Sequence, residues 1–248
     1  MKIIEKIEIK HFRSFDGGKL QPKVEIIQIN GFQSRTVLDW VSLFKPPVKI
    51  QVEAMSISHI TNKMVEDKEP FIGSEMYKKL VDIFSKENIL VAHNAQFDVE
   101  MLKRENLEVK NVIDTYKIAH ALDRDAKIPK YNLQYLRYFL DLEIENVVAH
   151  SALGDVKVLE KLFERLFQKM LVDLKEESAV IDEMLKISSQ PLLMKKFPFG
   201  KYNGSMVADV AKTDQGYLQW LLNEKNKSKD QEGNSEENWI YTLEYYLK

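Results

Sequence analysis

The stretch NILVAHNAQFDVEMLKREN, residues 88–106, decides how the chain folds around it. A short apolar run ends at His93, and apolar residues then recur at helical spacing from about Ala95, which predicts a buried strand followed by a helix. Ligands of α/β proteins gather at the carboxyl ends of strands, so Asp98 in the first helical turn could face a cleft. The alternative is that Asp98 only complements the helix dipole, worth ~0.3–1 kcal/mol.

A second histidine–aspartate pair occurs in VVAHSALGDV, residues 147–156. Asp155 falls on the apolar face of a long predicted helix, the face that also carries Leu159, Leu162 and Leu166. A carboxylate that continues a core face is costly to bury unless a cation neutralises it, although so early in the helix it could still reach water. His150 lies just before this helix, where an imidazole could act as a general base.

The order of predicted elements indicates an α/β fold. Three short strands rich in Ile and Val, starting at about residues 3, 24 and 38, suggest an antiparallel meander that opens a mixed sheet. Alternating helices and strands follow and predict one domain over residues 1–175. A connecting helix is expected over 176–190, then a small module over 191–248 with a mobile polar loop at about 224–238.

Composition excludes several classes of protein. The 248 residues include no cysteine, so disulfides, thiolate catalysis and cysteine-bound zinc are excluded. No apolar run is long enough to cross a bilayer, and a cytoplasmic location without membrane contact is expected. The net charge of −2 gives no general attraction to nucleic acid, so a polyanion site must be a local patch or must recruit metal cations.

The stretch MKKFPFGKYNG, residues 194–204, interleaves lysines with aromatic residues. Such a pattern is typical of nucleic-acid binding, because aromatic rings stack on bases and lysines contact phosphates. We expect Lys195, Lys196 and Lys201 to contact nucleic acid. The aromatic residues are expected instead to form the core of the module, namely Phe197, Tyr217 and Trp220.

HNAQFD (93–98) and HSALGD (150–155) resemble the second and third motifs of the DEDDh 3′–5′ exonucleases, the family of the polymerase proofreading subunit. The region from FPFGKYNG to YLQWLL is similar to the C-terminal module of exodeoxyribonuclease X and its relatives. The resemblance implies an RNase H-like mixed sheet flanked by helices and a two-metal exonuclease of DNA 3′ ends that uses Mg²⁺ or Mn²⁺. It also implies roles for individual residues: Asp98 and Asp155 as catalytic metal ligands, His150 as the general base, and His93, Asn94, Phe97 and Met55 as substrate contacts.

The first motif of the family, Asp-x-Glu on the first strand, is absent from residues 1–30. Aligning it with KIEIKH matches Glu8 to the glutamate but puts Lys6 at the aspartate. Aligning it with SFD matches Asp16 to the glutamate and puts Ser14 at the aspartate. Either Glu8 or Asp16 is therefore a candidate metal ligand, and both alignments lose the acid that would bridge the two ions.

This loss leaves a second hypothesis open, a catalytically impaired exonuclease fold that binds nucleic acid or a protein partner. An RNA exonuclease is a third, because no reader of the 2′-hydroxyl group can be named. The opening KIEIKHFRSFDGG also resembles the first strand of ABC-type recombination ATPases. No Gly-x-x-x-x-Gly-Lys-Ser/Thr loop follows it, which argues against an ATPase.

Overall fold

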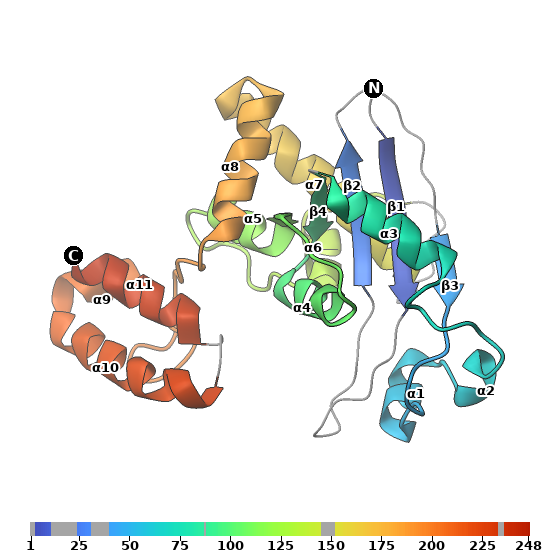
Figure 1. Cartoon of the computed structure of the whole chain (residues 1–248). Coiled ribbons are helices and arrows are strands. Elements are labelled where there is room, and N and C mark those ends of the chain that lie inside the picture. The colour runs from blue at the N-terminus through green and yellow to red at the C-terminus, as the bar shows by residue number, and fades with distance from the viewer. Residues whose placement is uncertain (1–2, 11–23, 31–39, 87, 145–151, 233–235) are drawn as a thin grey trace. The chain divides into compact units, whose positions relative to one another are not determined.

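The computed structural model describes residues 3–10, 24–30, 40–86, 88–144, 152–232 and 236–248. They belong to two compact units (Figure 1). The first unit comprises Met1–Tyr116 and Asn132–Leu185, and the second comprises Lys117–Tyr131 and Lys186–Lys248. The second unit thus contains a segment that the sequence assigned to the first domain.

A five-stranded mixed sheet in the order β3-β1-β2-β4-β5 forms the centre of the first unit. The strands span Ile3–Lys10 (β1), Val24–Asn30 (β2), Trp40–Leu43 (β3), Ile89–Ala92 (β4) and Asn111–Asp114 (β5). β4 and β5 pair in parallel, and Leu90, Val91 and Ala92 are almost completely buried. Burial on both faces is typical of a parallel strand covered by helices, so the predicted buried strand before His93 is confirmed.

The predicted antiparallel meander is formed only in part. β1 pairs antiparallel with β2, but β3 pairs with β1, in parallel, rather than with β2. The expectation for the third strand was wrong because the other edge of β2 is already occupied: Ile27 lies opposite Val91 of β4. The mixed sheet that was expected is nevertheless present.

Helices lie on both faces of this sheet. In Figure 1, α3 crosses in front of the sheet and α7 lies behind it, where α7 contacts β1 and β2. The apolar face predicted for α7 is buried at Leu159, Leu162 and Leu166. The described helices before residue 190 are α1 (Val52–Ser58), α2 (Asn62–Val65), α3 (Glu75–Ser85), α4 (Gln96–Arg104), α5 (Thr115–Leu122), α6 (Leu133–Phe139), α7 (Ala152–Leu174) and α8 (Glu177–Ser189). Most of α5 and the last turn of α8 belong to the second unit.

The second unit is built from α9 (Val207–Thr213), α10 (Gln215–Glu232) and α11 (Glu237–Leu247) around an aromatic core. Phe197, 1% exposed, stacks on Trp239 with ring centroids 5.3 Å apart. Lys195 ties the segment Lys117–Tyr131 to this unit, because its ammonium group donates to the carbonyls of His120 and Asp123. None of the described helices is long and apolar enough to cross a lipid bilayer.

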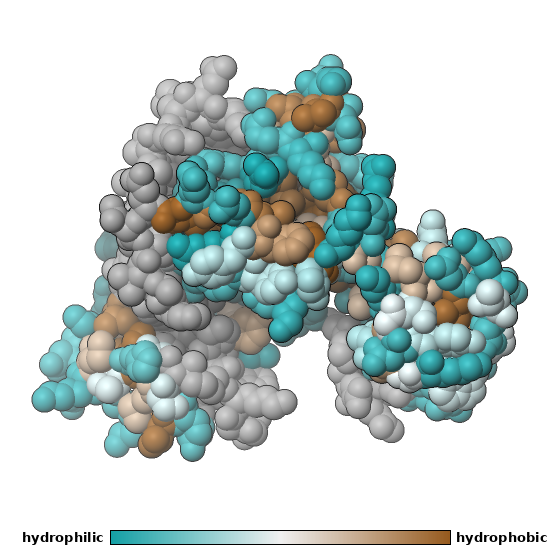
Figure 2. Space-filling view, turned by 180° about the vertical axis from the view of Figure 1, so that it is seen from behind, coloured by the Kyte–Doolittle hydropathy of each residue, from teal (hydrophilic) through white to brown (hydrophobic). Residues whose placement is uncertain are grey.

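Two expectations for the second unit differ from the structure. The polar segment predicted as a loop over 224–238 is helical up to Glu232, because its Glu, Lys and Gln residues are good helix formers and Lys227 pairs with Glu224 one turn away. Trp220 was expected in the core, but 54% of its surface is exposed. On the side seen in Figure 2, the surface of this unit is mostly hydrophilic with small apolar patches.

Gly200 is required by a close approach to Tyr217. Its φ is +68°, and a Cβ atom there would lie 2.8 Å from the Tyr217 hydroxyl oxygen. We expect Gly200→Ala to lower the free energy of unfolding of the second unit by about 1–3 kcal/mol, measured by chemical denaturation. Gly204→Ala is the matched control, because its φ is +84° but nothing lies within 4 Å. Equal losses in the two variants would contradict the close contact as the cause.

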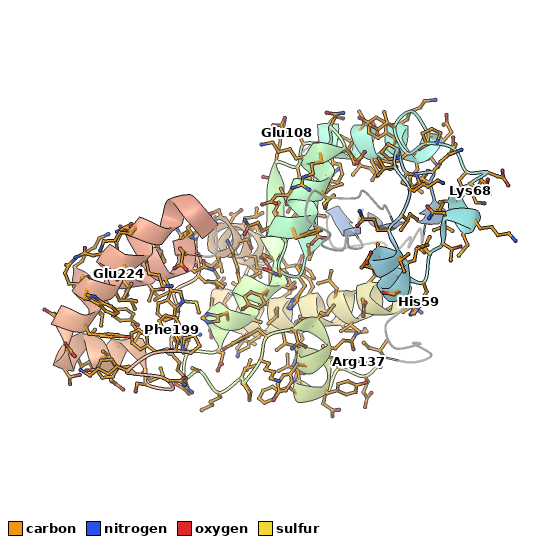
Figure 3. All side chains as sticks on the ribbon, turned by 90° about the horizontal axis from the view of Figure 1, so that it is seen from below. His59, Lys68, Glu108, Arg137, Phe199 and Glu224 are labelled. Atoms are coloured by element: carbon orange, nitrogen blue, oxygen red, sulfur yellow. The ribbon has the colours of Figure 1, made fainter. Side chains whose placement is uncertain are left out.

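His120 should make the second unit sensitive to acid. Burial, aided by the Lys195 charge, lowers the pKa of His120 from 6.5 to about 4. Between pH 6.5 and 4, His120 is therefore protonated in the unfolded chain but neutral in the folded chain. The free energy of unfolding falls as the pH falls through this window. We expect a loss of about 1–2 kcal/mol between pH 7 and 5 that His120→Leu abolishes. His59→Gln, at the exposed end of α1 (Figure 3), is the control for removing a histidine from the first unit.

Candidate active site

The turn between β4 and α4 presents Asp98. Asn94, the second residue after β4, has a φ of +62°, a left-handed conformation that Asn adopts more readily than most residues. This bend lets α4 start at Gln96, so that Asp98 lies in its first turn with its side chain half-buried. The predicted strand–turn–helix arrangement around Asp98 is therefore present.

Asp98 occupies a position that disfavours a negative charge. Burial, together with the nearby charge of Asp114, raises the pKa of its carboxyl from 3.8 to about 7. A bound cation would have the opposite effect, because an adjacent positive charge favours the ionised carboxylate. The donor chemistry and the burial of Asp98 therefore fit a hard divalent metal ion.

Asp114 holds the turn that presents Asp98, a role that was not expected from the sequence. Its buried carboxylate accepts hydrogen bonds from the backbone N–H groups of Asn94 (2.8 Å), Ala95 (3.1 Å) and Tyr116 (3.0 Å). One side chain at the end of β5 thus satisfies backbone donors of the turn that leads into α4 and of the first turn of α5. The sequence signal was an Asp directly after an apolar strand and before a helix.

His93 is fixed beside this turn by Thr115. The Thr115 hydroxyl donates its only proton to the carbonyl of Ala92 (3.1 Å), and His93 Nδ1 lies 2.9 Å from the Thr115 oxygen. Nδ1 must therefore carry a proton and donate to Thr115, which leaves Nε2 as the acceptor in the neutral ring. The half-buried His93 ring also packs edge-on with the Tyr116 ring, with ring centroids 5.7 Å apart.

The second predicted carboxylate, Asp155, lies in the first turn of α7 and is half-buried. The side-chain amide of Gln134, on α6, donates to Asp155 Oδ1 at 2.5 Å. This bond fixes the rotation of the carboxylate. Arg137 follows on the same helix (Figure 3), with its guanidinium group 5.3 Å from the ring centre of Tyr138.

The remaining predicted members of the acidic site are only partly described. His150 and Asp16 lie outside the described residues. Glu8 lies near the end of β1, which runs in the same direction as β4, since β2 is antiparallel to both. The carboxyl end of β1 is thus at the same edge of the sheet as the turn that carries Asp98. Within the described ranges, no three His, Cys, Asp or Glu side chains form a metal-binding group.

The other predicted substrate contacts are spread over two places. Asn94 and Phe97 are exposed at the β4–α4 turn, beside Asp98. Met55, on α1, is half-buried and packs against the small apolar cluster of Ile50, Ile60 and Val65. Contact of these residues with a substrate stays a prediction.

The three predicted lysines of the second unit all have protein partners. Lys195 donates to the two carbonyls named above, and Lys196 donates to the carbonyl of Ala126 at 2.9 Å. Lys201 is paired with Asp214, with 3.0 Å between Nζ and Oδ2, but 64% of its side chain is exposed. Lys196 and Lys201 are both exposed to solvent.

Comparison with known proteins gives this geometry its context. Residues 14–163 match the Exonuclease family, and residues 197–226 match the family of exodeoxyribonuclease X-like C-terminal regions. Exodeoxyribonuclease 10 of Escherichia coli (strain K12) is 33% identical over 209 residues, covering 81% of this chain and 84% of the relative. The epsilon subunit of DNA polymerase III of Treponema pallidum is 32% identical over 149 residues, which is 56% of this chain and 66% of the subunit.

A solved structure agrees at the level of the fold. Exonuclease X in complex with 5′ overhanging duplex DNA is 24% identical and has a TM-score of 0.50, over 75% of this chain and 99% of that one. The family match spans more than half of the chain, and it includes the β4–α4 turn and the start of α7. The chain therefore belongs to the exonuclease family, with an RNase H-like fold and an exodeoxyribonuclease X-like C-terminal region.

Proposed function

We propose that this protein is a metal-dependent 3′–5′ exonuclease that hydrolyses the phosphodiester bonds of DNA. The observation that carries the proposal is the presentation of Asp98, a half-buried carboxylate whose charge is disfavoured without a cation, at the edge of the sheet where β4 ends. DNA as the substrate is supported by the relative named exodeoxyribonuclease 10.

Each residue has a separate task in this proposal. Asp98 and Asp155 would hold Mg²⁺ or Mn²⁺, together with Glu8 or Asp16. The metal ions would supply an activated water and stabilise the leaving oxygen. Gln134 holds Oδ1 of Asp155 through its side-chain amide and so orients this carboxylate. His150 would accept the proton of the attacking water.

A second candidate function is a nucleic-acid-binding protein with impaired catalysis. It is favoured by the absence of Asp-x-Glu from residues 1–30 and of any three-ligand acidic group within the described ranges. Losing one of four acidic ligands weakens the attraction for two divalent cations. The two functions therefore differ in their metal binding, with two Mn²⁺ sites expected for the first and one or none for the second.

The proposal is tested by digestion of a 5′-labelled single-stranded DNA in Mg²⁺ or Mn²⁺. We expect a ladder that shortens from the 3′ end, and a loss of at least about 100-fold in rate for Asp155→Ala, because a metal ligand is removed. Lys157→Ala, two residues after Asp155 on α7, is the control for a change on the same helix. No digestion at high enzyme concentration, with DNA binding retained, would reject the exonuclease in favour of the binding protein.

Asp114→Asn tests whether the clamp on the β4–α4 turn supports metal binding. The amide group of Asn would place N–H donors against backbone N–H donors, so we expect a loss of about 1–3 kcal/mol in stability and about 10-fold in Mn²⁺ affinity. Both are measured on the full chain, by chemical denaturation and by calorimetric titration. Asp82→Asn, which removes an exposed ion pair with Lys86, should change neither. An Asp114→Asn variant that binds Mn²⁺ like the wild type would contradict the role of the clamp.

A further inference from the structure

We propose that a strip of four residues on the second unit, Lys201, Tyr202, Tyr217 and Trp220, binds single-stranded DNA by stacking on its unpaired bases. The inference rests on the proposed action on DNA, and it assigns to the second unit a substrate-binding site separate from Asp98 and Asp155. All four residues lie within the exodeoxyribonuclease X-like region, residues 197–226.

The exposure of Trp220 is the first observation. Trp220 lies on α10 with 54% of its surface exposed, whereas Trp239 in the core of the same unit is 6% exposed. Exposing a large indole ring leaves apolar surface in water, and the ring gains most from a flat apolar partner. Nucleobases are such partners, and aromatic side chains stack on them with little dependence on sequence.

The four side chains form a continuous series of contacts. The ring centroids of Trp220 and Tyr217 are 5.5 Å apart, and those of Tyr217 and Tyr202 are 4.9 Å apart. The Lys201 ammonium nitrogen lies 4.8 Å from the ring centre of Tyr202. The strip therefore has an exposed aromatic face at one end and an exposed positive charge at the other.

Asp214 holds the strip in place. Its carboxylate accepts hydrogen bonds from the Tyr202 hydroxyl (2.6 Å), the Lys201 ammonium group (3.0 Å) and the Tyr217 backbone N–H (3.0 Å). Gly200, which has no side chain, allows the turn before Lys201 to approach Tyr217 closely. Side chains that are fixed before binding lose less conformational entropy when the ligand arrives.

The combination of charge and stacking favours single-stranded DNA over duplex DNA. An ammonium group has three donors, so Lys201 can keep its bond to Asp214 and still contact a phosphate oxygen. In a duplex the base faces are already stacked on one another, and only an unpaired base offers its face to Trp220. A protein ligand would use the indole ring but would not require an oligonucleotide, which makes that alternative testable.

The test is a titration of the full chain with an oligothymidylate of about 15 nucleotides in EDTA, where metal-dependent digestion cannot occur. We expect the oligonucleotide to quench the tryptophan fluorescence of the wild type and not that of Trp220→Phe. By fluorescence anisotropy of a labelled oligonucleotide, Trp220→Ala should weaken binding by about 5- to 100-fold and Trp220→Phe by much less, as expected for stacking. Lys201→Met should weaken binding at low salt and reduce its salt dependence.

Tyr245→Ala is the matched control, because Tyr245 is an equally exposed aromatic residue on α11, 54% exposed, outside the strip. Its affinity should equal that of the wild type. An unchanged affinity in Trp220→Ala, or a duplex that binds and quenches as strongly as the single strand, would overturn the inference. Asp155→Ala separates the two proposals: quenching without digestion in this variant supports the strip, and an inactive wild type that still shows quenching rejects only the nuclease.

Discussion

The carboxylate of Asp114 is the interaction on which the candidate site depends. It accepts three backbone hydrogen bonds, two from the turn after β4 and one from the start of α5. Because these donors belong to the turn before α4 and to α5, one buried side chain links the starts of both helices. The same charge raises the pKa of Asp98 and so makes that position more favourable to a cation. Asp114, at the end of β5, therefore both holds the turn and affects the charge of Asp98.

Lysine residues in the second unit illustrate how a charged side chain can serve the fold instead of a ligand. Lys117 donates to the carbonyls of Ser188 and Gln190, at the end of α8, and Lys195 donates to two carbonyls at the end of α5. Carbonyls at helix carboxyl ends lack intrahelical partners, so a lysine that reaches them stabilises the helix. These contacts explain why the segment Lys117–Tyr131 belongs to the second unit.

The proposed metal ligands of the first and second motifs are carried by elements that reach the same edge of the sheet. Asp98, in the first turn of α4, and the carboxyl end of β1 are both at this edge, as the strand directions require. Asp155 is supported from another element, since the side-chain amide of Gln134 on α6 donates a hydrogen bond to it. The proposed chemistry thus depends on carboxylates that the chain holds through separate elements. The loss of one acid would weaken the proposed metal binding without removing the scaffold for the other carboxylates.

Local sequence determined much of this protein. The apolar run before His93, the helical spacing around Asp98 and the apolar face of α7 were predicted, because periodicity reports which side of an element is buried. The candidate residues Asp98 and Asp155 also followed from short motifs. The pairing of β3 with β1 and the exposure of Trp220 did not follow, since each depends on neighbours far away in the chain. The helix over 224–232 was missed for a local reason, because its polar residues are good helix formers.

Tertiary structure alone decided how the candidate site is supported. Asp114 and Gln134 lie 16 and 21 residues from the carboxylates they support, Asp98 and Asp155, and neither belongs to a motif that spacing could reveal. Likewise, the contact series from Lys201 to Trp220 exists only because α10 packs against the turn at Gly200. Sequence specifies which residues can perform chemistry, but hydrogen bonds between separate elements decide where those residues are held, because such bonds form only after the chain has packed.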